Sequence, residues 1–108
     1  MNPDTETEGE ILTFWTLQDR SREGRPLGEW LFAELERLGV EGATLSGGLV
    51  GRSRTGAVHA VTLLDVAEQP LQVSVVTTAT EAARVLAALA GRGLNLFYSR
   101  VPARFGTL

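Results

Sequence analysis

Two stripes of apolar residues with helical spacing constrain this chain more than any other feature. The first predicts a helix that begins at Pro26 and ends at Gly39, and its apolar face consists of Leu27, Trp30, Leu31, Leu35 and Leu38. The second follows Thr78 and Glu81, which have capping-box spacing, ends at Gly91, and consists of Ala82, Val85, Leu86 and Leu89. A helix with one apolar face must pack that face against another layer.

Runs rich in β-branched and aromatic residues surround these helices and predict the other layer. Proline cannot donate to a strand ladder, so Pro70 indicates a turn or a bend in one long strand, and Pro102 closes the last strand. The predicted strands are Ile11–Leu17, Ala43–Val50, Val58–Val66, Leu71–Thr77 and Leu94–Val101.

This order predicts an α+β fold of the ferredoxin-like, split βαβ type. The elements run β-α-β-β-α-β with an extended middle β excursion, and both helices cover one face of an antiparallel sheet. We expect one domain over residues 11–101, a disordered acidic tail over 1–10 and a short tail over 102–108. The acidic start has no apolar core, so it resembles neither a signal peptide nor a membrane span.

Adjacent aromatic residues place apolar side chains on both faces of the predicted sheet. Phe14 and Trp15 are neighbours in the first strand, and Phe97 and Tyr98 are neighbours in the last, so each pair points to opposite faces. Helices can cover only one of these faces. We expect a second copy of the chain to cover the other, in a symmetric oligomer.

Composition excludes several classes of function. The net charge of -3 provides no electrostatic footprint for nucleic acid. The absence of cysteine excludes disulfides and thiolate sites and is compatible with a cytoplasmic protein, while a single histidine argues against zinc. There is no lysine, hence no lysine nucleophile, and no catalytic signature is present. We therefore predict no catalytic residues and no metal site.

A glycine-punctuated stretch, residues 42–56, suggests where an anion could bind. Gly48 and Gly51 leave backbone N–H groups open to close approach, and Arg52 and Arg54 supply planar forks of donors for carboxylate or phosphate. A solvated surface loop explains the arginines equally well, and a bulge or a tight subunit contact explains the glycines.

Other arginines form a second group of candidates. Arg20, Arg22 and Arg25 precede the first helix, whose N-terminus favours anions, although pairing with Asp19 and Glu23 in solvent is the preferred interpretation. Arg92 and Arg100 could close an anion pocket against a neighbouring subunit, or could simply solubilise the end of the sheet. Three further residues are interpreted as structural: Trp15 and Trp30 as core or interface anchors, and His59 as a hydrogen-bonded strand residue.

The chain resembles the PII-like proteins, and within them the group catalogued as domain of unknown function one hundred and ninety. The likeness runs from about Ile11 to Val101. It is carried by Asp19, Gly24-Arg-Pro-Leu27, Gly42-Ala-Thr44, Gly48, Gly51 and His59.

The resemblance implies a non-enzymatic homotrimer that binds a small anionic effector, such as an adenine nucleotide, in clefts between subunits. It also implies a loop, here about Arg52 to Ala57, that controls a partner such as a membrane transporter or channel. The effector residues expected on this basis are Arg25, Gly48, Gly51, Arg52, Arg54, Arg92 and Arg100.

The chain departs from the pattern of this group at Gly47, Val50 and Arg52-Ser53, and the phosphate-binding loop of PII proteins is reduced to Gly91-Arg-Gly93. These departures favour one alternative, a structural oligomer that binds nothing small. A second alternative is an acylphosphatase-like hydrolase, in which Arg22 or Arg25 would hold phosphate and Asn95 would orient water.

Overall fold

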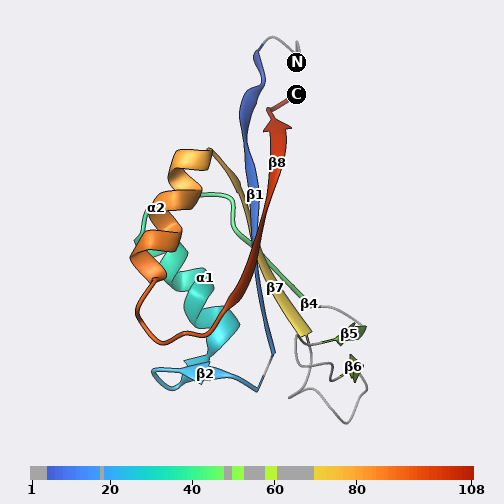
Figure 1. Ribbon diagram of the computed structural model, residues 1–108, viewed down its shortest axis with the longest axis vertical. Coiled ribbons are helices and arrows are strands. Elements are labelled where there is room, and N and C mark those ends of the chain that lie inside the picture. Colours follow the sequence, from blue (N-terminus) through green and yellow to red (C-terminus); the bar gives the residue numbers. More distant parts are fainter. Residues whose placement is uncertain (1–4, 18, 48–49, 53–57, 61–69) are drawn as a thin grey trace.

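The computed structural model describes residues 5–17, 19–47, 50–52, 58–60 and 70–108. Its main layer is a four-stranded antiparallel sheet with strand order β4-β7-β1-β8. These strands are β4 (Thr44–Gly47), β7 (Pro70–Thr77), β1 (Thr7–Leu17) and β8 (Phe97–Phe105). Helices α1 (Leu27–Arg37) and α2 (Ala79–Leu89) both lie on one face of it (Figure 1). The predicted ferredoxin-like split βαβ fold is therefore confirmed.

Both helices end where the sequence predicts. Thr78 accepts a hydrogen bond from the Glu81 backbone N–H at the start of α2, as a capping box requires. The chain leaves α1 through Gly39 and α2 through Gly91, and both glycines have positive φ, at 81° and 77°. Pro26 is the N-cap of α1 and stands just before the first helical residue.

The core lies between the helices and one face of the sheet. Its sheet side includes Leu12, Phe14, Val73 and Val75, and its helix side comes from the two predicted stripes; the stripe residues fully buried there are Leu31, Leu35, Ala82 and Val85. The strict alternation of buried and less buried residues in β7 places Val75 in this core, at 1 % exposure, and Val76 on the opposite face, at 45 %.

The outer strands extend beyond their predicted ends. β1 begins at Thr7 and pairs with β8 as far as Phe105, so Thr7–Glu10 and Pro102–Phe105 belong to the sheet rather than to tails. The expected domain boundaries at 10 and 102 were wrong at these positions. Pro102 lies inside β8, where it is tolerated because β8 is an edge strand with β1 as its sole neighbour among the described strands.

The polar segment between β1 and α1 contains a small hairpin. β2 (Ser21–Arg22) pairs with β3 (Arg25–Pro26) around Glu23 and Gly24, which both have positive φ. In the β excursion, β5 (Val50–Arg52) pairs with β6 (Val58–Ala60) as an antiparallel ribbon away from the helices (Figure 1). The remainder of the predicted strand Val58–Val66 lies outside the described residues.

Candidate functional site

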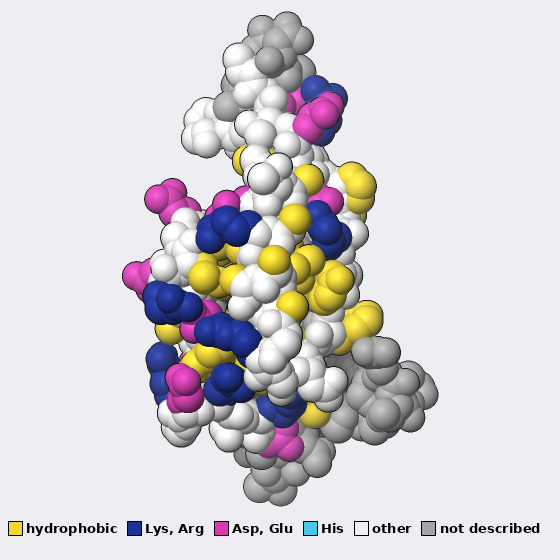
Figure 2. All heavy atoms as spheres, turned by 60° about the vertical axis from the view of Figure 1, so that its left-hand side comes forward, with side chains coloured by type: hydrophobic (Ala, Val, Ile, Leu, Met, Phe, Trp, Pro, Cys, Tyr) yellow, Lys and Arg dark blue, Asp and Glu magenta, His cyan; other side chains and the backbone are white. Residues whose placement is uncertain are grey.

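The β2–β3 hairpin, α1 and the connection between α2 and β8 meet in a group of arginine side chains, which we call the arginine cluster: Arg20, Arg22, Arg37 and Arg92. Arginine side chains are visible on the helix-covered side of the molecule, with acidic side chains between them (Figure 2). Trp30 of α1 lies at the centre of this cluster, because its ring receives two of the guanidinium groups.

Two arginines of the hairpin fix the backbone of the connection between α2 and β8. Arg20 donates to the carbonyl oxygens of Leu94 and Asn95, the latter at 2.9 Å, and Arg22 donates to that of Arg92 at 3.1 Å. Asn95 has a φ of 50°, a strained value for a residue other than glycine that these bonds help to hold. Arg20 and Arg22 thus act on the fold by positioning residues 92–95.

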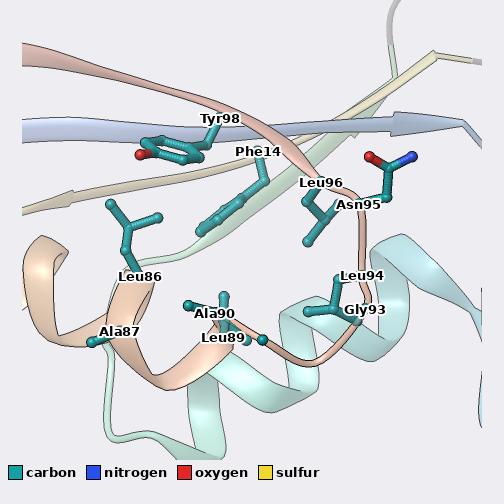
Figure 3. A pocket seen from close by; sticks show the side chains of 11 residues that line it. Phe14, Leu86, Ala87, Leu89, Ala90, Gly93, Leu94, Asn95, Leu96 and Tyr98 are labelled. Carbon is teal, nitrogen blue, oxygen red and sulfur yellow. The ribbon is translucent and has the colours of Figure 1, made fainter.

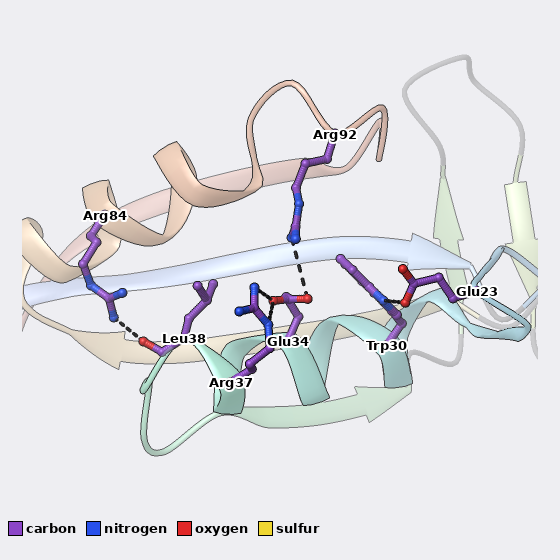
Figure 4. Close-up of polar contacts among 7 residues, drawn as sticks. All are labelled: Glu23, Trp30, Glu34, Arg37, Leu38, Arg84 and Arg92. Atoms are coloured by element: carbon purple, nitrogen blue, oxygen red, sulfur yellow. Dashed lines mark hydrogen bonds and ion pairs between the residues drawn. The ribbon is translucent and has the colours of Figure 1, made fainter.

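Trp30 joins the hairpin to α1. Its indole N–H donates to a carboxylate oxygen of Glu23 at 2.9 Å, and the Arg22 and Arg92 guanidinium carbons lie 5.1 Å and 5.5 Å from the ring centroid (Figure 4). Trp30 is only 4 % exposed, which confirms its interpretation as a core anchor. Guanidinium groups at such distances are stabilised by about 0.5–2 kcal/mol each.

Glu34 is the acid of the cluster, and its side chain is only 9 % exposed. One carboxylate oxygen accepts from Arg37, one helical turn away, and the other lies 3.7 Å from Arg92 Nη1 (Figure 4). That separation is an ion pair but too long for a hydrogen bond. Among the described residues, Arg92 Nη1 and Arg22 Nε are buried atoms that have no hydrogen-bond partner.

Arg92 therefore combines a fixed backbone with a loosely held side chain. Its carbonyl is bound by Arg22, and Gly91 and Gly93 on either side have positive φ, while its side chain remains 31 % exposed. A cation in this state can meet an external anion at little cost. Of the predicted effector residues, Arg92 has the surroundings best suited to that role.

The other predicted site residues are placed as follows. Arg25 is exposed in β3, opposite Arg22 in the hairpin register and therefore near the cluster. Arg100 belongs to β8, where it bonds to Glu10 at 2.6 Å and to the Ala79 carbonyl at the start of α2, whereas Arg92 follows the end of that helix. The fold thus does not bring Arg100 to Arg92 within one chain.

The remaining candidates belong to the β excursion. Gly51 and Arg52 are strand residues of β5, where they pair with His59 and Val58, and the structure describes only their backbone. Gly48 and Arg54 lie outside the described residues. Their role as effector residues stays a prediction.

The sequence did not predict a cavity of about 500 Å³ between α2 and the start of β8. Side chains of both elements and of β1 form its walls, with Leu86, Phe14 and Tyr98 facing one another (Figure 3). None of the residues that line it is charged, so it offers an anion no counter-charge. An anionic ligand is better served by the arginine cluster. Leu94 and Leu96, two apolar residues beyond the helix, were the signal for this cavity.

Within the described segments, no three histidine or acidic side chains gather as metal ligands would, and neither helix is long and apolar enough to cross a membrane. Two shifted pKa values occur at the surface end of α2. The hydrogen bond from Arg84 lowers the pKa of Glu81 and raises that of Arg84 itself, outweighing the smaller effect of desolvation.

The sequence model of the family DUF190, described as "Uncharacterized ACR", matches residues 9–93. No curated protein matches the chain. Two solved structures share the fold. A protein from Thermus thermophilus, assigned as PII-like signaling, has a TM-score of 0.62 at 16% identity, with 93% of this chain and 89% of that one covered. CPII from Thiomonas intermedia, a nitrogen regulatory PII-like protein bound to ADP, AMP and bicarbonate, has a TM-score of 0.65 at 15% identity, with coverages of 94% and 99%.

Proposed function

This chain belongs to the DUF190 family and has a PII-like fold, and on that premise we propose that it is a regulatory module that binds a small anionic effector. The observation that carries the proposal is Arg92, whose backbone is fixed by the hairpin while its guanidinium keeps one long ion pair. A similar fold in CPII holds ADP, AMP and bicarbonate, so an adenine nucleotide or bicarbonate is a reasonable first ligand.

We further propose a homotrimer with effector sites between neighbouring subunits. Within one chain Arg92 and Arg100 attach to opposite ends of α2, so both can contribute to one site only if they come from different subunits. Arg25, Gly48, Gly51, Arg52 and Arg54 would complete it. The segment Arg52–Ala57 would then transmit effector binding to a partner such as a membrane transporter or channel.

Calorimetry and thermal-shift measurements with ADP, ATP, cyclic dinucleotides, bicarbonate and inorganic phosphate test this function. A ligand at 100 times its Kd should stabilise the fold by about 2.7 kcal/mol. Arg92→Gln should remove the response, whereas Arg104→Gln should preserve it, because Arg104 is 60 % exposed and pairs with Glu6 at the far end of the sheet. No response of the wild type to any of these ligands would refute effector binding.

The role of the β excursion needs a separate variant. Arg52→Gln together with Arg54→Gln should abolish the effector response while leaving the unfolding midpoint unchanged, because neither residue belongs to the helix-covered core. An unaltered ligand affinity in this double variant would exclude both arginines from the effector site.

A further inference from the structure

Glu34 is poised to act as an internal competitor of the effector. It is a carboxylate on the core side of α1, and it stands 3.7 Å from the one cluster arginine that is both partly exposed and without a hydrogen bond at its buried Nη1. From this geometry we propose that Glu34 holds Arg92 in a waiting position and makes the site selective for phosphate-bearing effectors over monoanions. The inference rests on the proposed effector function.

Release of Arg92 should cost little. At 3.7 Å it gives up an ion pair but no hydrogen bond, and Glu34 keeps the hydrogen bond from Arg37. The buried carboxylate therefore never becomes an unpaired charge, which is the usual penalty when such a pair is broken. The backbone stays in place as well, because the bonds from Arg20 and Arg22 hold carbonyl groups and not the Arg92 side chain.

The competitor sets a threshold that depends on the charge of the ligand. A carboxylate fixed in the same molecule has an effective concentration on the order of millimolar or more. Bicarbonate and acetate carry a single charge, like Glu34, and gain little by replacing it. A phosphate group carries about -1.5 to -2 charges at pH 7 and three acceptor oxygens, so it can bind the guanidinium fork in bidentate fashion and win the exchange.

Neutralising Glu34 tests this directly. Glu34→Gln keeps the shape of the side chain and should lower the Kd for bicarbonate about tenfold, with a smaller gain for inorganic phosphate and ADP. Glu36→Gln is the matched control, because it removes the same charge from an exposed position two residues along the same helix. The effect of Glu34→Gln must exceed that of Glu36→Gln in isothermal titration.

A second variant should act in the opposite direction and does not depend on the folding of the first. Arg37→Gln removes the other partner of Glu34, so the carboxylate should hold Arg92 more firmly and weaken phosphate binding severalfold. Arg37 has an exposed side chain, so its loss should leave the fold intact.

The outcomes separate this inference from the function on which it rests. Tighter bicarbonate binding in Glu34→Gln and weaker phosphate binding in Arg37→Gln would support it. If the wild type binds an anion and Glu34→Gln matches Glu36→Gln, Glu34 is no competitor, although effector binding stands. If no chain binds inorganic phosphate, ADP or bicarbonate, both proposals fail.

Discussion

The two faces of the central sheet are both apolar, yet they are covered by different means. On one face Leu12, Phe14 and Val75 are buried under the helices of the same chain. On the other, Trp15, Val76 and Val101 keep between 40 % and 50 % of their surface exposed, around a hydrogen bond between Thr13 and Ser74. The comparison teaches that a single chain completes half of its hydrophobic core, and that the other half is available for assembly.

The largest contrast should come from neighbouring aromatic residues of β1. Phe14→Ala should lower the free energy of unfolding by about 3–5 kcal/mol, because it leaves a cavity under the helices. Trp15→Ala should cost the isolated chain far less, because Trp15 is 40 % exposed. Urea denaturation at low protein concentration measures both. Equal losses would mean that the open face is as much a core as the covered one.

Assembly should depend on the open face alone. Val76→Glu places a charge in the middle of that face and should convert the proposed trimer to monomers, as measured by analytical ultracentrifugation. Phe32→Glu is the control, because Phe32 is 38 % exposed but belongs to α1 on the opposite side of the sheet. A trimer that survives Val76→Glu would show that its subunits meet elsewhere.

The covered face also depends on how α2 begins. Thr78→Ala removes the acceptor of the Glu81 backbone N–H and should destabilise the protein by about 1 kcal/mol in thermal unfolding. Thr80→Ala, two residues further on, changes an exposed helical position and should be neutral or slightly stabilising, since alanine is the better helix former. A comparable loss in both variants would remove the cap from the explanation.

The smallest expected effect is a pH dependence at the surface of α2. The hydrogen bond from Arg84 lowers the pKa of Glu81 below its ordinary value of 4.5, so the stabilisation is fully present above that pH and is lost as the pH falls through the lowered pKa. Glu81→Gln should flatten this part of the acid limb in a series of unfolding curves. Arg84 also donates to the Leu38 carbonyl, which ties α2 to the end of α1. An acid limb that is identical in Glu81→Gln would assign the loss to other carboxylates.

Much of the fold was predictable because its signals are local. Helical spacing and the cap at Thr78 gave both helices, and alternation gave the strands. The ends of the outer strands were less predictable: acidic composition hid Thr7–Glu10 and Pro102 hid the last residues of β8, since an edge strand tolerates both once its partner is fixed.

The candidate site was less accessible to sequence reasoning. Arg92 was identified from its two flanking glycines, and Arg22 was weighed as a surface residue or as a phosphate ligand. The structure instead shows Arg22 bonded to the backbone of residue 92, a contact between residues 70 positions apart. Glu34 was not singled out at all, because a single acid in a helical stripe carries no sign of what lies across from it.

The sequence by itself determined the order of elements, the apolar side of each helix and the presence of apolar side chains on both faces of the sheet, because these follow from the spacing of residues along the chain. Only the tertiary structure decided that Trp30 lies beside Arg22 and Arg92, and that Glu34 stands opposite Arg92. Those contacts join the hairpin, α1 and the end of α2. Their geometry depends on how the helices dock on the sheet, which no local pattern specifies.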